Sequence, residues 1–216
     1  MNRKLIAGIV CLILFLLLIA LLGTADVAAI GPENTSIGFS SINQAIHEAT
    51  GVKMLWYKLT NYLGIFSILA GLCFACLGLL QLIQRKSLKE VDKELYALGG
   101  LFVVLAIIYI LFEFIVINRR PVIIPGDAHV EASFPSSHTM LVFVILGSIL
   151  ILLGKYIHNR GIRVLLQIIC GILILAAVLG RLLSGVHWFT DIIGSIFISA
   201  ALLFFFAAAL DKIEKT

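Results

Sequence analysis

The chain has 216 residues, of which 61% are hydrophobic and only 13% are charged, and its formal net charge is +4. A soluble domain of this size needs a charged surface, so the composition argues against a soluble protein and indicates that lipid is the solvent. The modest charge and the lack of a basic tract in the sequence argue against nucleic-acid binding.

Six apolar runs are long enough to cross the roughly 30 Å hydrocarbon core of a bilayer as helices. In chain order they are Leu5–Leu22, Leu63–Leu80, Leu95–Ile117, Ser136–Leu153, Arg163–Leu183 and Trp188–Leu210. The sequence shows no long internal repeat and no low-complexity linker. We therefore predict a single all-α domain over residues 1–216, folded as an integral membrane bundle of six transmembrane helices.

The first run has an alternative interpretation as a cleavable signal peptide, because Arg3 and Lys4 precede it. Its apolar stretch, however, is longer than the roughly 7–15 residues usual for the apolar region of a signal peptide. A retained helix is therefore the favoured interpretation.

The first outer segment, residues 24–60, is polar and contains an amphipathic piece around Ile42–Ala49. Trp56 and Tyr57 follow it, and aromatic residues of this kind favour the headgroup region of a membrane. We expect a short interfacial helix that leads into the second span.

Lys and Arg accumulate in cytoplasmic loops and so predict the orientation of the chain. With a cytoplasmic N-terminus, most of the basic residues fall on the cytoplasmic side: Arg3, Lys4, Arg85, Lys86, Lys89, Lys93, Lys155, Arg160, Arg163, Lys212 and Lys215. We therefore expect both termini in the cytoplasm, in a multi-pass protein of a bacterial plasma membrane.

Several polar motifs fall at the opposite, extracytoplasmic ends of the spans. Arg119-Arg120-Pro121 closes the third span, where the proline is expected to stop the helix. Phe134-Pro135-Ser136-Ser137-His138 directly precedes the fourth span. Arg181 ends the fifth span, and His187 opens the sixth with Asp191 four residues later. By the predicted topology, all these residues lie on one face of the membrane.

Three of these residues are suited to binding a phosphate group. Ser136 is a good helix N-cap, and the free backbone N–H groups that follow it, at the positive end of the helix dipole, favour an anion. Arg120 and Arg181 can each grip phosphate oxygens through two parallel hydrogen bonds.

The histidines are suited to covalent catalysis. His187 and Asp191 are four residues apart and share one face of a helix. A carboxylate bonded to one ring nitrogen fixes the tautomer and leaves the other nitrogen as a nucleophile. His138 can then protonate the leaving alcohol as a general acid.

This ordered set of motifs resembles the type 2 phosphatidic acid phosphatase superfamily. That family has a Lys followed seven residues later by Arg-Pro, then Pro-Ser-Gly-His, then Ser-Arg-x5-His-x3-Asp. Here Arg120-Pro121 ends the first motif and Pro135-Ser136-Ser137-His138 is the second. Gly180-Arg181 with His187 and Asp191 is the third.

The resemblance implies a membrane phosphatase that needs no metal or other cofactor. His187 would attack phosphorus and form a phosphohistidine, Asp191 would orient His187, and His138 would protonate the leaving oxygen. The residues implied in phosphate binding are Arg120, Arg181 and Ser136, with Ser137 presenting its backbone N–H.

The sequence departs from the family pattern at three positions. Ser137 replaces Gly, Gly180 replaces Ser, and Glu113 occupies the place of the Lys. The last change reverses a charge, and an ionisable residue within a span usually has a partner. We hypothesise that Glu113 pairs with and positions Arg119, Arg120 or Arg181, and that Arg119 takes over from the missing Lys.

The predicted partners are membrane lipids and a lipid phosphate substrate, and the sequence does not indicate the oligomeric state. Phosphatidic acid, phosphatidylglycerophosphate and undecaprenyl pyrophosphate are equally compatible with the motifs. Two alternatives are a lipid phosphotransferase and a catalytically silent protein that binds lipid phosphates. A transporter is less favoured, because Glu113 is the only ionisable residue placed deep in a predicted span.

The remaining outer residues have simpler interpretations. His129 and Glu131 match no motif position and are expected to be solvated, with a role in shaping substrate entry as the alternative. Trp188 is expected to anchor its helix at the membrane surface.

Overall fold

The computed structural model describes residues 2–215, and within them it is all-helical apart from two isolated β-bridges. Six helices are long and apolar enough to cross a membrane: α1 (Arg3–Leu22), α3 (Met54–Arg85), α4 (Lys93–Phe114), α5 (Ser137–Tyr156), α6 (Arg160–Ser184) and α7 (Phe189–Ile213). The shorter elements are α2 (Ser40–Thr50) and the 3₁₀ turns η1 (Pro32–Asn34) and η2 (Leu88–Glu90). The predicted all-α bundle of six spans is confirmed.

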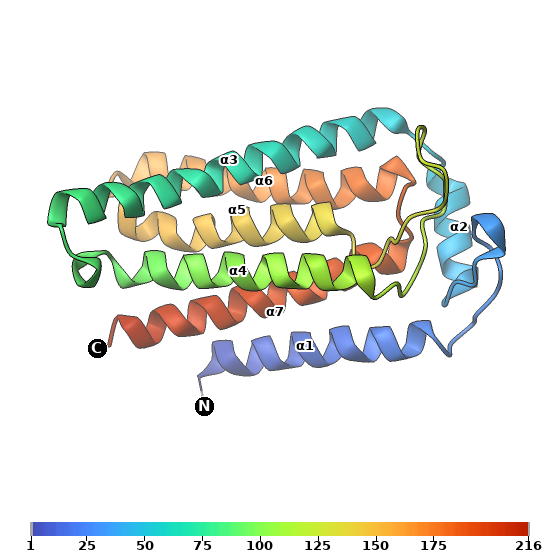
Figure 1. Cartoon of the computed structure of the whole chain (residues 1–216), viewed down its shortest axis with the longest axis horizontal. Helices are drawn as coiled ribbons and strands as arrows, with labels where there is room; N and C mark the ends of the chain where they lie inside the picture. Colours follow the sequence, from blue (N-terminus) through green and yellow to red (C-terminus); the bar gives the residue numbers. More distant parts are fainter. Residues whose placement is uncertain (1, 216) are drawn as a thin grey trace.

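Helix α5 forms the centre of the bundle, because 61% of its most apolar 18-residue stretch is buried inside the protein. Only 11% of the corresponding stretch of α6 is buried. The other helices pack around α5 and α7, and α1 lies along α7 (Figure 1). Large apolar side chains remain exposed along the outer helices, as expected for surfaces that contact lipid. Phe134 packs between Phe15 and Phe112, with ring centroids 5.7 and 6.1 Å away, so the loop before α5 is joined to the apolar core.

Both termini lie at one end of the bundle and α2 lies across the other (Figure 1). Asn43 ties α2 to the start of α7: its side-chain amide donates to Thr190 Oγ1 at 3.0 Å and accepts from the Thr190 backbone N–H at 3.1 Å. The short helix predicted within residues 24–60 is therefore present, and it is fixed to the loops that surround it.

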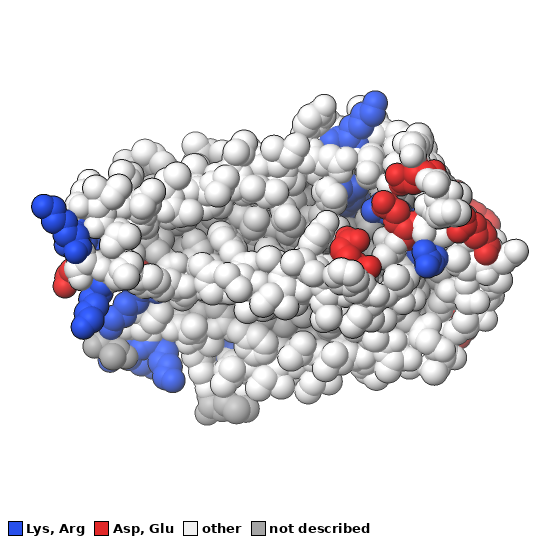
Figure 2. All heavy atoms as spheres, in the orientation of Figure 1, with Lys and Arg blue, Asp and Glu red and all other residues white. Residues whose placement is uncertain are grey.

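Charged residues are distributed unequally between the two ends (Figure 2). Basic side chains predominate at the end with the termini, and acidic side chains are more numerous at the α2 end. This asymmetry agrees with a cytoplasmic location of the termini, which remains a prediction.

The end of α4 differs from the prediction. The helix ends at Phe114, and residues 115–120 are not helical, so Pro121 is not its stop signal. Three consecutive β-branched residues, at positions 115–117, favour an extended backbone here. Arg119 forms a β-bridge with Ala132, so this segment pairs with the chain that leads to α5 instead of continuing the helix.

The second span also differs from the prediction, because α3 begins at Met54, within the segment assigned to the outer loop. The polar first turns of α3 therefore lie at the α2 end of the bundle. Trp56, Tyr57, Thr60 and Asn61 are consequently helical and belong to the wall of the site described below.

A polar cluster joins three helices at the opposite end. The carboxylate of Asp92 accepts hydrogen bonds from Gln81 at 2.9 Å, Arg85 at 3.0 Å and Tyr156 at 3.2 Å. Its backbone N–H donates to Gln81 Oε1 at 2.9 Å. These contacts connect α3, the start of α4 and the end of α5.

We predict that Asp92→Ala lowers the thermal stability of the protein in detergent. The change leaves the buried Gln81 amide without an acceptor, at a cost of about 1–3 kcal/mol. Thermal unfolding followed by light scattering or tryptophan fluorescence measures the effect, with Lys89→Ala as the control at an exposed neighbouring position. An equal change in both variants would contradict the role given to Asp92.

Candidate active site

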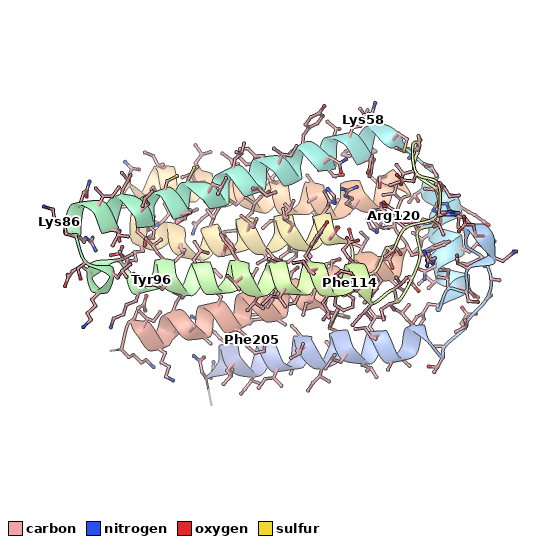
Figure 3. All side chains as sticks on the ribbon, in the orientation of Figure 1. Lys58, Lys86, Tyr96, Phe114, Arg120 and Phe205 are labelled. Carbon is pink, nitrogen blue, oxygen red and sulfur yellow. The ribbon has the colours of Figure 1, made fainter. Side chains whose placement is uncertain are left out.

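The motif residues converge at the α2 end of the bundle, although they come from three separate segments. These are the extended chain between α4 and α5, the first turn of α5, and the junction of α6 and α7, which includes the last turn of α6 and the first turn of α7. Figure 3 places Arg120 at this end, near the end of α4 that is marked by Phe114. The prediction that these motifs lie on one face is therefore consistent with their position in the fold.

His187 lies in the tight turn between α6 and α7. The turn needs Gly185, which has φ of 69°, and a Cβ at this position would collide with the backbone of Gly51. His187 is 3% exposed. Its Nδ1 lies 3.1 Å from the carbonyl oxygen of Ser133 and 3.7 Å from Oδ2 of Asp191.

These contacts define the tautomer of His187. Both neighbours of Nδ1 are acceptors, so Nδ1 donates its proton and Nε2 keeps its lone pair. Nε2 is buried and has no hydrogen-bond partner within the protein. Nδ1 of His187 is therefore fixed by its acceptors, whereas Nε2 is free. The His187 side chain also lines the cavity described below.

The pKa of His187 is lowered to about 4, chiefly by burial, while the nearby Asp191 opposes this shift and Arg120 and Arg181 add to it. The imidazole is therefore neutral at neutral pH. A neutral imidazole is the form that can act as a nucleophile.

Asp191 is fully buried in the first turn of α7. Its Oδ1 accepts from the side-chain amide of Asn118 at 3.1 Å, and its Oδ2 accepts from the backbone N–H of Trp188 at 2.9 Å. The carboxylate thus holds the His187 loop and is itself held by Asn118. Sequence reasoning identified Asp191 but missed Asn118, which lies two residues before the Arg120 motif position.

Arg120 is one of two arginines with unpartnered N–H groups at the site. Its Nη2 forms an ion pair with Glu131 at 3.1 Å, while Nε and Nη1 are buried without a partner within the protein. Glu131 matches no motif position and was expected to be solvated. Its side chain is 52% exposed, in agreement with that expectation, and it also pairs with a motif arginine.

Arg181 is the second arginine with unpartnered N–H groups, and it is fully buried. Its Nη2 donates to Oδ1 of Asn61 at 2.5 Å, and its guanidinium lies 4.9 Å from the ring centroid of Tyr57. Nε and Nη1 have no partner within the protein. Unsatisfied buried N–H groups are costly, and guanidinium groups are well matched to phosphate oxygens.

A cavity of about 290 Å³ lies between these groups. Its walls include Arg120 and His187, together with Ser133, Ser137 and His138. The hydroxyl of Ser133 is also buried and unpartnered. Arg181 is just behind this wall, close enough for its charge to act on both His138 and His187. The cavity wall thus combines several donors and one free imidazole nitrogen with the carboxylates of Glu113 and Glu131, and the donors are suited to an oxyanion.

An apolar groove of about 530 Å³ continues from this cavity between α3, α4 and α5. The cavity and the groove share Tyr109, Ser137, His138 and Met140 as lining residues. Gly64 permits this shape, because a Cβ there would lie 3.3 Å from the His138 ring. His138 therefore lies at the junction of a polar chamber and an apolar channel.

Two predicted phosphate-binding side chains do not line the cavity. Ser136 is at the N-cap of α5 as predicted, but it is fully buried and its hydroxyl lies 3.0 Å from Thr139 Oγ1. Arg119 donates from Nη1 to the carbonyl oxygen of Val130 at 2.7 Å. Its expected role as a replacement for the missing Lys is not supported by this position.

Glu113 does line the cavity, but it does not form the hypothesised ion pair. Among residues 2–215, the side-chain hydrogen bonds and ion pairs of Arg119, Arg120 and Arg181 are made with Val130, Glu131 and Asn61. The neighbour of Glu113 is Tyr109, one turn earlier on α4.

The structure explains the glycine at position 180. A Cβ there would lie 2.6 Å from Cγ2 of Thr60 and 3.2 Å from the Trp56 ring. Helix α3 thus occupies the space that a serine side chain would need, and it supplies Tyr57 and Asn61 beside Arg181. These α3 residues were not identified as site residues from the sequence.

The prediction that Trp188 anchors its helix at the membrane surface is wrong. It is 2% exposed, its Nε1 donates to the Arg119 carbonyl oxygen at 2.8 Å, and its ring lies 5.5 Å from that of His47. It is part of the packed site and is not a surface anchor.

Comparison with known proteins agrees with this geometry. The PAP2 superfamily matches residues 114–215, the part of the chain that contains Arg120, His138, Arg181, His187 and Asp191. A search of curated protein sequences found no significant match.

A similar fold is found in the crystal structure of a transmembrane PAP2-type phosphatidylglycerolphosphate phosphatase from Bacillus subtilis. The TM-score is 0.63 at 22% sequence identity, and the alignment covers 95% of this chain and 96% of the other. At this identity the likeness concerns the fold. The family match over residues 114–215, just under half of the chain, and the shared fold both agree with the resemblance carried by the sequence motifs.

Proposed function

We propose that the protein is a membrane lipid phosphatase that hydrolyses a lipid phosphate or pyrophosphate through a phosphohistidine on His187. The observation that carries this proposal is the free Nε2 of His187, which lines the same cavity as the unpartnered N–H groups of Arg120. The PAP2 superfamily match over residues 114–215 and the fold shared with a phosphatase support the same reaction class.

In the first step, Nε2 of His187 attacks phosphorus while the bond to the leaving oxygen breaks. The N–P bond forms, the leaving oxygen takes the bonding electrons, and His138 supplies its proton. Nδ1 of His187 keeps its proton, which the Ser133 carbonyl oxygen and Asp191 hold during the attack.

In the second step, water attacks the phosphohistidine. His138, now neutral, accepts a proton from the water, and the N–P bond breaks to release inorganic phosphate and restore His187. Transfer to another alcohol in place of water would make the protein a phosphotransferase, and the dependence of product on added acceptor distinguishes the two reactions.

The arginines stabilise the charge that develops on the phosphoryl oxygens. Arg181 is held by Asn61 and Tyr57, and Arg120 is held by Glu131, so the two guanidiniums are oriented before substrate binds. Fixed donors in a water-poor site act strongly on transition-state charge. This preorganisation also supports catalysis over mere binding of lipid phosphates.

The apolar groove supports a lipid substrate. It is lined mainly by residues of α3, α4 and α5, and it meets the polar cavity at His138. A lipid can keep its tail in this groove while its phosphate lies against His187. Phosphatidic acid, phosphatidylglycerophosphate and undecaprenyl pyrophosphate all have such a tail, and the Bacillus subtilis protein of similar fold is a phosphatidylglycerolphosphate phosphatase.

We place the site at the extracytoplasmic face of a bacterial plasma membrane. The support is the excess of basic side chains at the end with the termini, opposite the site (Figure 2). Protease or thiol-reagent accessibility of tags on each end in intact cells tests this orientation.

We predict that His187→Ala reduces phosphate release from phosphatidic acid by at least about a thousandfold, because the nucleophile is lost. The reaction of the wild type should persist in EDTA, since the proposed chemistry uses only side chains. Purified protein in detergent and a phosphate assay measure both effects. His158→Ala, an exposed histidine at the opposite end, is the control. Full activity of His187→Ala, or loss of wild-type activity in EDTA, would contradict the mechanism.

We predict that Asn118→Ala lowers kcat by about tenfold to a hundredfold with little change in KM. The side-chain amide of Asn118 acts on Asp191 and not on the substrate, so its loss disturbs the orientation of His187. A large rise in KM with unchanged kcat would show that Asn118 contacts substrate instead. Thermal unfolding of the same variant separates this effect from a general loss of stability.

A further inference from the structure

Glu113 is a carboxylate without an ion-pair partner, and it lies in the wall of the cavity proposed to bind phosphate. It lies in the last turn of α4 and lines the cavity together with Arg120, Glu131, His138 and His187. A carboxylate at this position opposes the binding of negative charge, so its presence calls for a chemical explanation.

The nearby arginines do not neutralise Glu113. Arg120 pairs with Glu131 at 3.1 Å, and Arg181 donates to Asn61 at 2.5 Å. No ion pair to Glu113 occurs among the residues that the structure describes. The described neighbour on its own helix is Tyr109, an uncharged phenol that also lines the cavity.

The position of Glu113 relative to His138 indicates which part of the substrate it meets. In an in-line displacement the leaving oxygen lies opposite the nucleophile, here opposite Nε2 of His187. His138 is the proton donor to that oxygen, and both His138 and Tyr109 line the groove as well as the cavity. The leaving group therefore passes between His138 and the α4 face that contains Tyr109 and Glu113.

The site has few positive charges to offset a phosphate. Arg120 and Arg181 contribute two, and that of Arg120 is already paired with Glu131, so no cation is left over for a second phosphoryl group. A pyrophosphate has a second phosphoryl group as its leaving group, with at least one more negative charge. That charge would lie beside Glu113 with no described cation to offset it.

We infer that Glu113 is a specificity-determining residue that makes the protein select lipid phosphomonoesters, whose leaving group is an uncharged alcohol, over lipid pyrophosphates. This inference rests on the proposed function, because it names the substrate class of the same site. A hydroxyl on the leaving alcohol is compatible with Glu113, since a carboxylate accepts hydrogen bonds.

The test compares farnesyl phosphate with farnesyl pyrophosphate, which share one tail and differ in the second phosphoryl group. The wild type is expected to have a kcat/KM at least about tenfold higher for the monophosphate, because the second phosphoryl group brings a further negative charge beside the Glu113 carboxylate in the cavity wall. Glu113→Lys is expected to shift the ratio of the two kcat/KM values toward the pyrophosphate by about tenfold or more. Glu113→Gln is expected to give an intermediate ratio.

Asp127→Asn is the matched control. It removes an exposed carboxylate from the loop before α5 without changing the wall of the cavity, so the ratio should stay at the wild-type value. If Glu113→Lys does not fold, the ratios of Glu113→Gln and the wild type still decide the question.

The outcomes separate this inference from the proposed function. Hydrolysis of both lipids with the same ratio in the wild type and the Glu113 variants overturns the role of Glu113 and leaves the phosphatase assignment intact. A wild-type preference for the pyrophosphate also overturns it. No phosphate release from either farnesyl substrate or from phosphatidic acid by the folded wild type overturns the proposed function, and this inference falls with it.

Discussion

A histidine can attack phosphorus only if one ring nitrogen is unprotonated and has no hydrogen-bond partner. The other ring nitrogen then keeps its proton, which an acceptor holds in place. In this protein the proton is held by the Ser133 carbonyl oxygen, 3.1 Å from Nδ1 of His187, and by Asp191 at 3.7 Å. Nε2 is kept unprotonated by burial, which lowers the pKa of the imidazole to about 4. The surrounding architecture maintains both conditions, because Asn118 holds Asp191 from the strand-like segment after α4.

The helical bundle fixes this arrangement by joining its two central helices directly beneath the site. The hydroxyl of Ser195 lies 3.0 Å from the Ser136 carbonyl oxygen and 2.8 Å from that of Asp191, and the Ser136 N–H donates to Asp191 O at 3.2 Å. The first turn of α5, with His138, is thereby locked to the first turn of α7. Helices α3 and α4 leave the groove between them, so in the proposed function one side of the bundle holds the catalytic groups while the groove takes the lipid tail.

The sequence predicted the class of fold and most of the residues that meet at the candidate site, because both depend on short-range patterns. Apolar runs longer than a bilayer core identify spans, and the spacing of Arg181, His187 and Asp191 places them at one helix boundary. Asn61, Asn118 and Ser133 could not be found in this way, since they act through contacts across the bundle. The end of α4 was missed because Pro121 suggested a stop signal, whereas the β-branched residues before it already favour an extended chain. The ion pair expected for Glu113 does not form, for a similar reason: charge alone indicates a need for a partner, but Arg120 pairs with Glu131 instead.

The central claim is that His187 becomes covalently phosphorylated, and trapping that intermediate tests it most directly. The folded protein in detergent would be mixed with lipid labelled in its phosphate, denatured within milliseconds, and digested for peptide mapping. The account predicts label on the peptide that contains His187, stable in alkali, lost in mild acid and absent from His187→Ala. Turnover of the lipid with no label on this peptide, or label on a different residue, would contradict it.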